Sequence, residues 1–255
     1  MQQDFADRDG VAVVTGATGG IGAAVAAMLA ERGSAVVLAY RSDAAAAEAL
    51  AQRLPRASAV QAVQAIQADL TDPAACAELI ARAGRVHTLV HAAGPHVPMV
   101  HLSRVEPERF AEQVAQDVLA CFNVVRAALP ALRAARGSLV AVTTAATRRF
   151  PVRDGLSAVP KGAVEALVRG IAAEEGRYGV RANCVGPGML TDGMATRLIA
   201  SGDLDERALA VARSNIPLRA FGTAADVAEA VCFLASDRAR FVTGQKLDVD
   251  GGYSV

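Results

Sequence analysis

A glycine-rich turn offers the clearest chemistry in this sequence. Gly16, Gly20 and Gly22 lie in the run Val-Thr-Gly-Ala-Thr-Gly-Gly-Ile-Gly, directly after the apolar segment Val11–Val14. Glycines let a backbone turn sharply and approach a ligand closely, and a helix that begins in such a turn directs free N–H groups at phosphates. The turn alone would also suit an ordinary loop. Between an apolar strand and an amphipathic helix, it predicts a dinucleotide pyrophosphate site.

The spacing of these glycines, TGxxxGxG rather than GxGxxG, resembles the short-chain dehydrogenase/reductase family, and the resemblance covers nearly the whole chain. Asp69-Leu70 matches the family's adenine-contacting pair, and His91-Ala-Ala-Gly94 stands where members usually have Asn-Asn-Ala-Gly. Pro187 to Thr191 matches the loop that holds the nicotinamide amide, and Asp248 to Gly252 resembles the closing segment. The resemblance implies these cofactor-binding residues: Gly16, Thr18, Gly20, Ile21, Gly22, Tyr40, Arg41, Ser42, Asp69, Leu70, Ala93, Gly94, Lys161, Pro187, Gly188 and Thr191.

The end of the second predicted strand decides between NAD and NADP. A free ribose 2′-hydroxyl favours a carboxylate there, whereas a 2′-phosphate favours a cation. Arg41 occupies that position and Ser42 adds a hydrogen-bond donor. An arginine grips phosphate with two parallel hydrogen bonds. Asp43 follows, but its place suits the N-cap of the next helix. We therefore expect NADP(H).

Lysine occurs only at positions 161 and 246 among 26 basic residues, which suggests that an amine is needed there. Family members usually work with an Asn, a Ser, a Tyr and a Lys, the tyrosine standing four residues before the lysine. Lys161 matches the lysine, Thr144 stands at the serine position and Asp117 at the asparagine position. Ser157 stands where the tyrosine is expected. The resemblance implies that Lys161, Ser157, Thr144 and Asp117 are the catalytic residues.

The serine at position 157 changes the chemistry. A phenol has a pKa near 10 and a neighbouring ammonium brings it within reach, but an aliphatic hydroxyl is no comparable acid. The tyrosines at 40 and 178 are poorly placed to replace it, and Tyr253 would need an unusual arrangement or a neighbouring subunit. Because Pro160 suits a first helical turn, Ser157 also fits an N-cap, with or without a bond to substrate. A plain polar helix residue remains the alternative for Asp117.

Three reactions remain compatible with these residues. Reduction of a C=C bond conjugated to a thioester forms an enolate, which hydrogen bonds hold and water or a carboxyl group protonates. The run Leu-Ser-Ala-Val-Pro-Lys resembles the 2,4-dienoyl-CoA reductase branch, although the upstream tyrosine of some members aligns near Ala146. The first hypothesis is an NADPH-dependent reductase of such an enoyl or dienoyl thioester or related enone. The second is a 3-oxoacyl carbonyl reductase that uses water and Lys161. The third is a cofactor-binding protein without redox turnover, as a partner subunit or a non-redox lyase or cyclase.

The histidines and cysteines give weaker signals. His87, His91, His96 and His101 lack ligand spacing, so we expect no metal site. His96 follows the fourth predicted strand, where it could line the substrate pocket or donate a proton. The cysteines at 76, 121, 184 and 232 form no CxxC pair and lie in apolar segments, which indicates buried thiols.

Short apolar runs alternate with longer amphipathic stretches throughout the chain. Strands are expected at 11–14, 35–40, 63–68, 87–92, 138–143, 180–185 and 246–249, and helices at 20–32, 43–54, 72–83, 106–134, 157–176 and 224–234. This alternation predicts a single-domain doubly wound parallel sheet, a Rossmann fold with helices on both faces, over 1–255. The least regular stretch, 191–213, is expected to be a mobile substrate lid.

The composition restricts the partners. The 255 residues carry 26 basic and 26 acidic side chains, so no field of one sign attracts nucleic acid or an anionic membrane. The chain begins without an apolar signal core and no run of 18 apolar residues appears, so a cytoplasmic protein is expected. Apolar positions on more than one face of the 157–176 helix predict an oligomer. The family resemblance implies a homotetramer or at least a homodimer that pairs through the helices at 106–134 and 157–176 and through the carboxyl-terminal segment.

Overall fold

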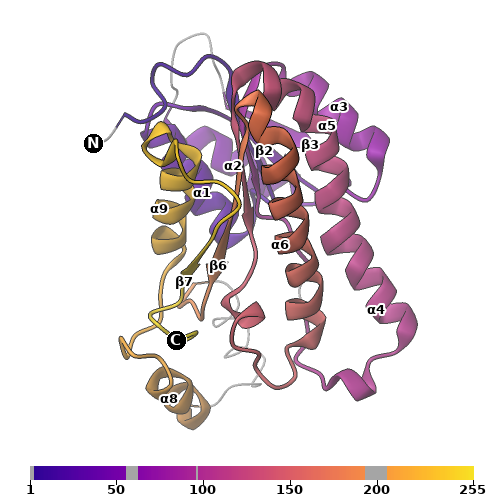
Figure 1. The fold of residues 1–255 in the computed structure, drawn as a ribbon, viewed down its shortest axis with the longest axis vertical. Helices are drawn as coiled ribbons and strands as arrows, with labels where there is room; N and C mark the ends of the chain where they lie inside the picture. Colours follow the sequence, from indigo (N-terminus) through magenta and orange to yellow (C-terminus); the bar gives the residue numbers. More distant parts are fainter. Residues whose placement is uncertain (1–2, 56–62, 96, 193–205) are drawn as a thin grey trace.

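Seven parallel strands form one sheet in the part of the chain that the computed structural model describes, residues 3–55, 63–95, 97–192 and 206–255. Their order is β3-β2-β1-β4-β5-β6-β7, which confirms the predicted doubly wound α/β fold (Figure 1). The strand order reverses between β1 and β4. Ligands of such sheets bind at this switch point, beyond the carboxyl ends of the strands.

The strands lie within about two residues of the predicted ranges. They are β1 Val11–Thr15, β2 Ala35–Tyr40, β3 Gln64–Gln67, β4 Val86–His91, β5 Ser138–Val142, β6 Arg181–Pro187 and β7 Lys246–Val249. Every residue of β4 and β5 is buried, as the near-continuous apolar runs of a covered parallel sheet require.

The α-helices alternate with these strands. They are α1 Gly20–Glu31, α2 Ala44–Arg53, α3 Pro73–Ala83, α4 Pro107–Val114, α5 Ala120–Ala135, α6 Gly155–Glu175, α8 Glu206–Ser214 and α9 Ala224–Ala235. Short 3₁₀ turns occur at η1 Leu102–Arg104, η3 Ala145–Thr147, η4 Gly176–Tyr178 and η5 Asp237–Ala239, and η2 Ala115–Leu119 is a π-helical turn. Two aspartates cap helices: Asp43, as predicted, accepts from the Ala46 N–H, and Asp72 accepts from the Ala74 N–H.

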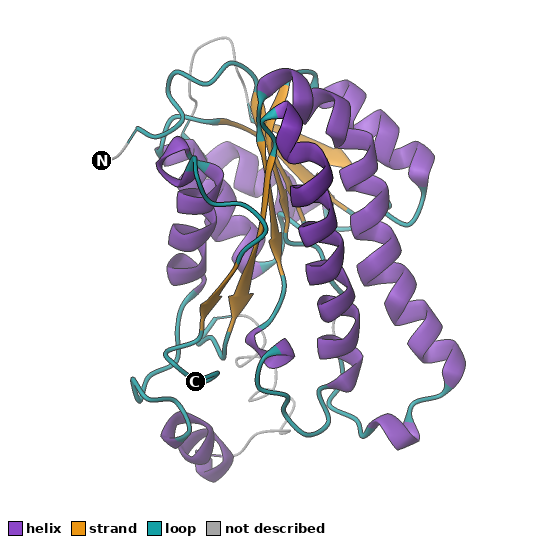
Figure 2. Cartoon of the chain, viewed as in Figure 1, coloured by secondary structure: helices purple, strands orange, loops and turns teal. Residues whose placement is uncertain are grey.

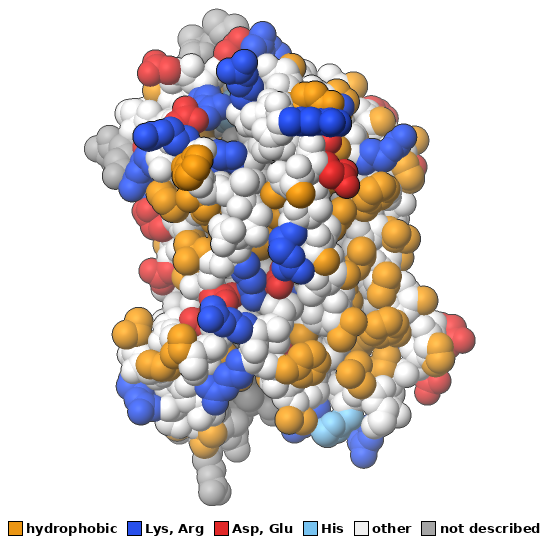
Figure 3. Space-filling view, in the orientation of Figure 1, with side chains coloured by type: hydrophobic (Ala, Val, Ile, Leu, Met, Phe, Trp, Pro, Cys, Tyr) orange, Lys and Arg blue, Asp and Glu red, His pale blue; other side chains and the backbone are white. Residues whose placement is uncertain are grey.

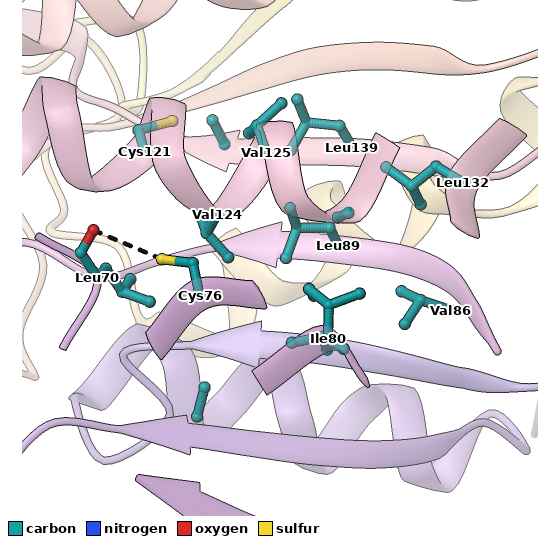
Figure 4. Packing of buried hydrophobic residues seen from close by; sticks show 14 of the residues in the cluster. Leu70, Cys76, Ile80, Val86, Leu89, Cys121, Val124, Val125, Leu132 and Leu139 are labelled. Atoms are coloured by element: carbon teal, nitrogen blue, oxygen red, sulfur yellow. Dashed lines mark hydrogen bonds between the residues drawn. The ribbon is translucent and has the colours of Figure 1, made fainter. Parts of the chain in front are cut away.

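Helices cover both faces of the sheet (Figure 2). One apolar layer packs α3, α5 and α6 against the strands, and the other packs α1, α2 and α9 against the opposite face. Figure 4 shows the first layer, where Cys76 of α3 lies close to Leu70 and Val124. The four cysteines are free and buried, as predicted, and burial raises the pKa of the Cys121 thiol to about 12.

The single helix predicted over 106–134 is wrong in one respect. The structure has α4, the π-turn η2 and α5 in its place, with Asp117 in the middle of the π-turn. A π-turn adds one residue to a helical turn and changes the direction in which the following side chains point. This local insertion is invisible in the apolar periodicity, and such turns occur frequently at functional sites.

The stretch Pro107–Ala135 is long and apolar enough to cross a membrane by length and composition. Its inner side belongs to the sheet layer, with Cys121, Val124 and Leu132 fully buried, so it is better described as a core helix. Its outer side leaves Leu119 and Phe122 about half exposed. Figure 3 shows hydrophobic side chains gathered on this side of the molecule, over α4, α5 and α6.

Most of the predicted lid, 191–213, lies outside the described residues. Its described carboxyl-terminal part belongs to the regular helix α8 rather than to an irregular segment.

Candidate active site

The glycine turn lies at the switch point, where the ends of β1 and β4 meet. Gly16 has a φ of +66°, and a Cβ atom there would lie 2.7 Å from the Ala93 nitrogen. A Cβ on Gly22 would lie 2.2 Å from the Gly16 carbonyl oxygen. Only glycine fits these two positions, so the backbones of the turn and of the segment after β4 are in direct contact.

Helix α1 begins at this turn with its N–H groups unobstructed. Its N-cap, Gly19, has no side chain to cap them, and its first turn holds no acidic residue. The N–H groups of the first turn, which include those of Gly20, Ile21 and Gly22, have no partner within a helix by construction. The positive end of the helix dipole adds to their attraction for a phosphate. The turn therefore has the backbone conformation and polarity that a dinucleotide pyrophosphate requires, with Thr18 inside it.

The residues predicted to distinguish NADP from NAD lie at the end of β2. Arg41 and Ser42 are exposed directly after Tyr40. The Asp43 Oδ1 accepts from the Ala46 N–H as the cap of α2, as predicted. Hydrogen bonds from the Thr71 N–H and hydroxyl lower the pKa of the Asp69 carboxyl, and the positive charge of Arg41 lowers it further. Arg41 and Asp69 thus lie near each other at the adenosine side of the switch point.

Lys161 and Asp117 form an ion pair at the centre of the site. The Lys161 Nζ lies 2.7 Å from Asp117 Oδ1, and the Asp117 side chain is 1% exposed. Asp117 Oδ1 accepts no other hydrogen bond in the described part of the chain, while Oδ2 accepts one from Gln113 Nε2 at 2.8 Å. A Cβ on Gly94 would lie 3.2 Å from the Lys161 Nζ. The pair therefore lies against the backbone that follows β4, beside the glycine turn.

Two hydroxyl groups complete the predicted catalytic set. Thr144 follows β5 and caps η3, where its oxygen accepts from the Ala146 N–H at 3.1 Å. Its own O–H therefore remains able to donate. Ser157 lies one helical turn before Lys161 on α6, so the two side chains emerge on the same side of the helix. Position 146 holds an alanine, so no phenol enters the site from there.

The prediction that Ser157 caps the helix is wrong. Helix α6 begins at Gly155 with Asp154 as its N-cap, and the Ser157 N–H already donates to the Asp154 carbonyl at 3.1 Å. Pro160 consequently lies inside the helix rather than in its first turn. There it deprives the Leu156 carbonyl of a helical partner, a cost that packing must offset. Ser157 is thus free of capping and its hydroxyl can serve a ligand.

The tyrosines lie elsewhere. Tyr178 follows α6 at its far end, 4.6 Å under the Arg133 guanidinium, and Tyr40 ends β2. The Tyr253 ring lies 4.7 Å from the Arg149 guanidinium. None of these phenols is one turn from Lys161.

His91 replaces the first asparagine of the family pattern. It is fully buried at the end of β4, and its Nδ1 lies 3.0 Å from the Thr15 hydroxyl. Burial, with a smaller contribution from the Lys161 charge, lowers the pKa of His91 to about 3. The ring is therefore neutral at physiological pH. His96 lies outside the described residues, and no group of metal-binding side chains occurs among those described.

The predicted nicotinamide loop is held by the carboxyl-terminal segment. The Gly188 N–H donates to the Val249 carbonyl at 2.9 Å, and a Cβ on Gly188 would lie 2.7 Å from the Asp250 Cα. The Thr191 N–H donates to the Gly222 carbonyl at 2.8 Å. Because Pro187 ends β6 directly before this loop, the loop leaves the sheet at the same edge as the glycine turn.

A second buried cluster of charges surrounds Lys246, and the sequence did not predict its partners. Lys246 Nζ lies 2.9 Å from Asp248 Oδ1 and 3.2 Å from Glu165 Oε1, and it donates to the Thr147 hydroxyl at 2.6 Å. Thr147 in turn donates to the Thr144 carbonyl at 3.2 Å. The cluster therefore braces the turn that carries Thr144. The scarcity of lysine marked position 246 in the sequence, but its partners come from three separate elements.

Comparison with known proteins agrees with this geometry. The sequence model of a family described as enoyl-(acyl carrier protein) reductase matches residues 16–254. L-fucose dehydrogenase of Oryctolagus cuniculus is 33% identical over 242 residues, covering 95% of this chain and 84% of that protein. Cis-4-hydroxycyclohexanecarboxylate dehydrogenase of Sinomonas cyclohexanicum is 35% identical over 259 residues, covering 100% and 99%. A solved short-chain type dehydrogenase/reductase from Mycobacterium ulcerans superposes with a TM-score of 0.87 at 30% identity, covering 97% and 90%.

Proposed function

Because the chain belongs to the short-chain dehydrogenase/reductase family of oxidoreductases, which use NAD or NADP, we propose that it reduces an activated C=C bond with NADPH. The substrate class is an enoyl or dienoyl thioester, or a related enone. The observation that carries this proposal is the buried Lys161–Asp117 pair at 2.7 Å, which occupies the catalytic position with a serine rather than a phenol beside it.

The side chains of this site suit an enolate better than an alkoxide. When bound, NADPH supplies a hydride to the β-carbon of the acyl group. Negative charge then develops on the thioester oxygen, and the Lys161 ammonium and the hydroxyls of Ser157 and Thr144 are the donors that stabilise it. Reduction of a ketone would instead form an alkoxide, which requires a good acid at once. Aliphatic hydroxyls do not provide one.

The Asp117 carboxylate restricts the position and the net charge of the Lys161 ammonium. The carboxylate lies 2.7 Å from the ammonium and is itself fixed by Gln113. We infer that the pair keeps the Lys161 head group in one position and neutralises its charge before substrate binds. A neutral pair accepts an uncharged acyl group with little repulsion or desolvation, and the ammonium can still donate to a developing anion.

NADPH is favoured over NADH by Arg41. The guanidinium is exposed at the end of β2 and free for a 2′-phosphate, and the neighbouring carboxylate of Asp43 is turned into the cap of α2. A ribose 2′-hydroxyl would find no carboxylate directly after this strand.

Carbonyl reduction of the 3-oxoacyl type is the second candidate. The names of two relatives, L-fucose dehydrogenase and cis-4-hydroxycyclohexanecarboxylate dehydrogenase, describe the oxidation of alcohols and favour it. In this hypothesis the proton comes from water, because a serine rather than a tyrosine stands four residues before Lys161.

A matched panel of thioesters separates the candidates. Purified protein with NADPH is given enoyl, dienoyl and 3-oxoacyl thioesters of one chain length, and loss of NADPH absorbance is followed. The proposal expects turnover of at least one unsaturated thioester, with Lys161→Met inactive. Turnover of 3-oxoacyl thioesters alone would identify a carbonyl reductase, and no turnover at all would favour a binding protein.

We also propose that the exposed apolar side of α5 and α6 pairs two copies of the chain. Leu119, Phe122 and Val159 are between 42% and 52% exposed on this side, and such a patch is usually covered. A monomeric mass in light scattering at micromolar concentration would contradict this.

A further inference from the structure

Asp154 differs from the other aspartates that begin helices. It is the N-cap of α6, yet its side chain accepts no capping hydrogen bond. Asp43 and Asp72, at the same position on α2 and α3, accept from backbone N–H groups at 2.9 and 2.8 Å. In the described part of the chain, no hydrogen bond or ion pair holds the Asp154 carboxyl. A half-buried carboxyl that forgoes its cap is available to a ligand.

The carboxyl lies on the same face of α6 as the catalytic side chains. Residues 154, 157 and 161 are spaced by three and four positions, which places Asp154, Ser157 and Lys161 in one row along the helix. At ~1.5 Å per residue, Asp154 lies about one turn beyond Ser157 and about 10 Å from Lys161 along the axis. An acyl group bound with its oxygen beside Lys161 and Ser157 and its chain directed toward the start of α6 would bring its α-carbon toward Asp154.

Described residues of the segment after β4 contact α6 near both ends of this row. Gly94 lies against Lys161, where a Cβ would be 3.2 Å from Nζ. Further along, the Val100 N–H donates to the Arg153 carbonyl at 3.0 Å, and a Cβ on Gly155 would meet Leu102 at 2.4 Å. The described parts of this segment therefore lie beside both Lys161 and the two residues that flank Asp154 at the start of α6.

Burial raises the pKa of the Asp154 carboxyl to about 6, and no charged group contributes to this shift. The charged or titratable side chains nearest in the chain, Arg153 beside it and His101 and Arg104 on the adjacent segment, are exposed. Of the described carboxyls whose pKa departs clearly from its ordinary value, this is the one that is raised. Asp154 thus retains a proton at mildly acidic pH, above the range in which an aspartate ordinarily ionises.

The other groups of the site are poorer acids. His91 is neutral, since its pKa is lowered to about 3, and its Nδ1 is engaged with Thr15. The Lys161 ammonium is held by Asp117. The hydroxyls of Ser157 and Thr144 are weak acids. Among the described groups of the site, Asp154 combines an available proton with a place in the row.

We propose that Asp154 is the catalytic general acid of the proposed reduction and delivers its proton to the α-carbon of the enolate. This inference rests on the proposed function. After hydride addition to the β-carbon, the electron pair of the enolate forms the new C–H bond at the α-carbon while the Asp154 O–H bond breaks. The C=O bond re-forms, and the aspartate left behind takes its next proton from solvent. The carboxyl thereby replaces the phenol that position 157 lacks.

The substitution Asp154→Asn removes the proton and keeps the shape and capping ability of the side chain. We expect the rate at saturating enoyl thioester to fall roughly 10²–10⁴-fold, the usual contribution of a positioned acid, with NADPH affinity unchanged. Asp154→Glu is expected to recover part of the rate. Asp154→Ser, which also suits an N-cap, repeats the test if the asparagine variant is unstable. Asp72→Asn is the matched control and should keep the wild-type rate.

Two further readouts distinguish an acid from a structural residue. The wild-type rate should fall as pH rises through the ionisation of Asp154, because its protonated form is the active one, and this limb should disappear in Asp154→Asn. In heavy water the wild-type product should carry deuterium on one face of the α-carbon. The variant should give a mixture of both faces, because solvent then protonates an enolate that is no longer shielded.

The outcomes separate the two proposals. If the wild type reduces an enoyl thioester, and Asp154→Asn keeps the rate within threefold and the deuterium on one face, Asp154 is not the acid although the proposed function stands. If the wild type reduces no unsaturated thioester, the proposed function fails and the assignment of Asp154 fails with it.

Discussion

The Asp117–Lys161 pair should be strongly coupled in the folded protein. Asp117 is 1% exposed and the Lys161 side chain 13%, so either charge left alone would be buried without a counter-ion. Breaking a buried pair by removing one partner typically costs about 3–5 kcal/mol. Asp117→Ala also leaves Gln113 Nε2 without its acceptor, although Lys161 keeps some access to water. Lys161→Met leaves the more deeply buried charge, that of Asp117, without a counter-ion. It should therefore lower the free energy of unfolding at least as much as Asp117→Ala does.

The double variant removes both charges together. It leaves only the Gln113 donor unpaired, a loss of about 1–3 kcal/mol, so it should be no less stable than either single variant. The coupling energy of the cycle should therefore reach about 3 kcal/mol. Asp117→Asn should be the mildest change, because the Gln113 Oε1, buried without a hydrogen bond among the described residues, can rotate to accept from the new amide.

Urea unfolding of the four proteins without cofactor, followed by circular dichroism at neutral pH, measures this cycle. If the loss of unfolding free energy in the double variant equals the sum of the losses in the two single variants within about 0.5 kcal/mol, the two charges do not interact. The Lys161–Asp117 geometry, and the catalytic role derived from it, would then be wrong.

Other changes test the cofactor, the missing phenol and the buried histidine. Arg41→Ala should weaken NADPH binding roughly ten- to a hundredfold, about 1.5–3 kcal/mol, and leave NADH binding unchanged in a fluorescence titration; equal losses for both would contradict the assignment. Ser157→Tyr should raise the rate of 3-oxoacyl thioester reduction, by up to roughly 10²–10⁴-fold, and lower the rate of enoyl thioester reduction. The substitution removes no helix cap, because Asp154 is the N-cap of α6. Unchanged rates with both substrates would refute the described site. His91 has a folded pKa of about 3 against 6.5 unfolded, so stability should fall as pH drops below 6.5, by about 2 kcal/mol at pH 5 for this residue. His91→Asn should reduce that loss in urea unfolding at pH 7 and pH 5, and an identical loss in the variant would contradict the buried, neutral ring.

The order of strands and helices follows closely from the sequence, because a covered parallel sheet imposes apolar runs of fixed length. Strands β2 and β7 begin and end at the predicted residues. The glycine turn was equally predictable from the sequence, because Gly16 and Gly22 make close contacts that no larger residue permits.

The start of α6 was not predictable from the same signals. A serine three residues before Pro160 has the pattern of a helix beginning, but the structure starts the helix at Gly155, where the segment after β4 packs against it. The π-turn around Asp117 and the ion pair with Lys161 also depend on contacts between elements distant in the chain. Asp154 was not predictable as a site residue, because a single aspartate outside any family motif carries no signal until its burial is known.

The destination of the hydride tests the central claim most directly. NADPH carrying deuterium at the transferred position is incubated with the protein and an equimolar pair of enoyl and 3-oxoacyl thioesters, and the products are examined by nuclear magnetic resonance and mass spectrometry. The account predicts a saturated thioester with deuterium on its β-carbon and an intact carbonyl. Deuterium found only on the hydroxyl-bearing carbon of a 3-hydroxyacyl product, with the enoyl thioester recovered unchanged, would contradict it.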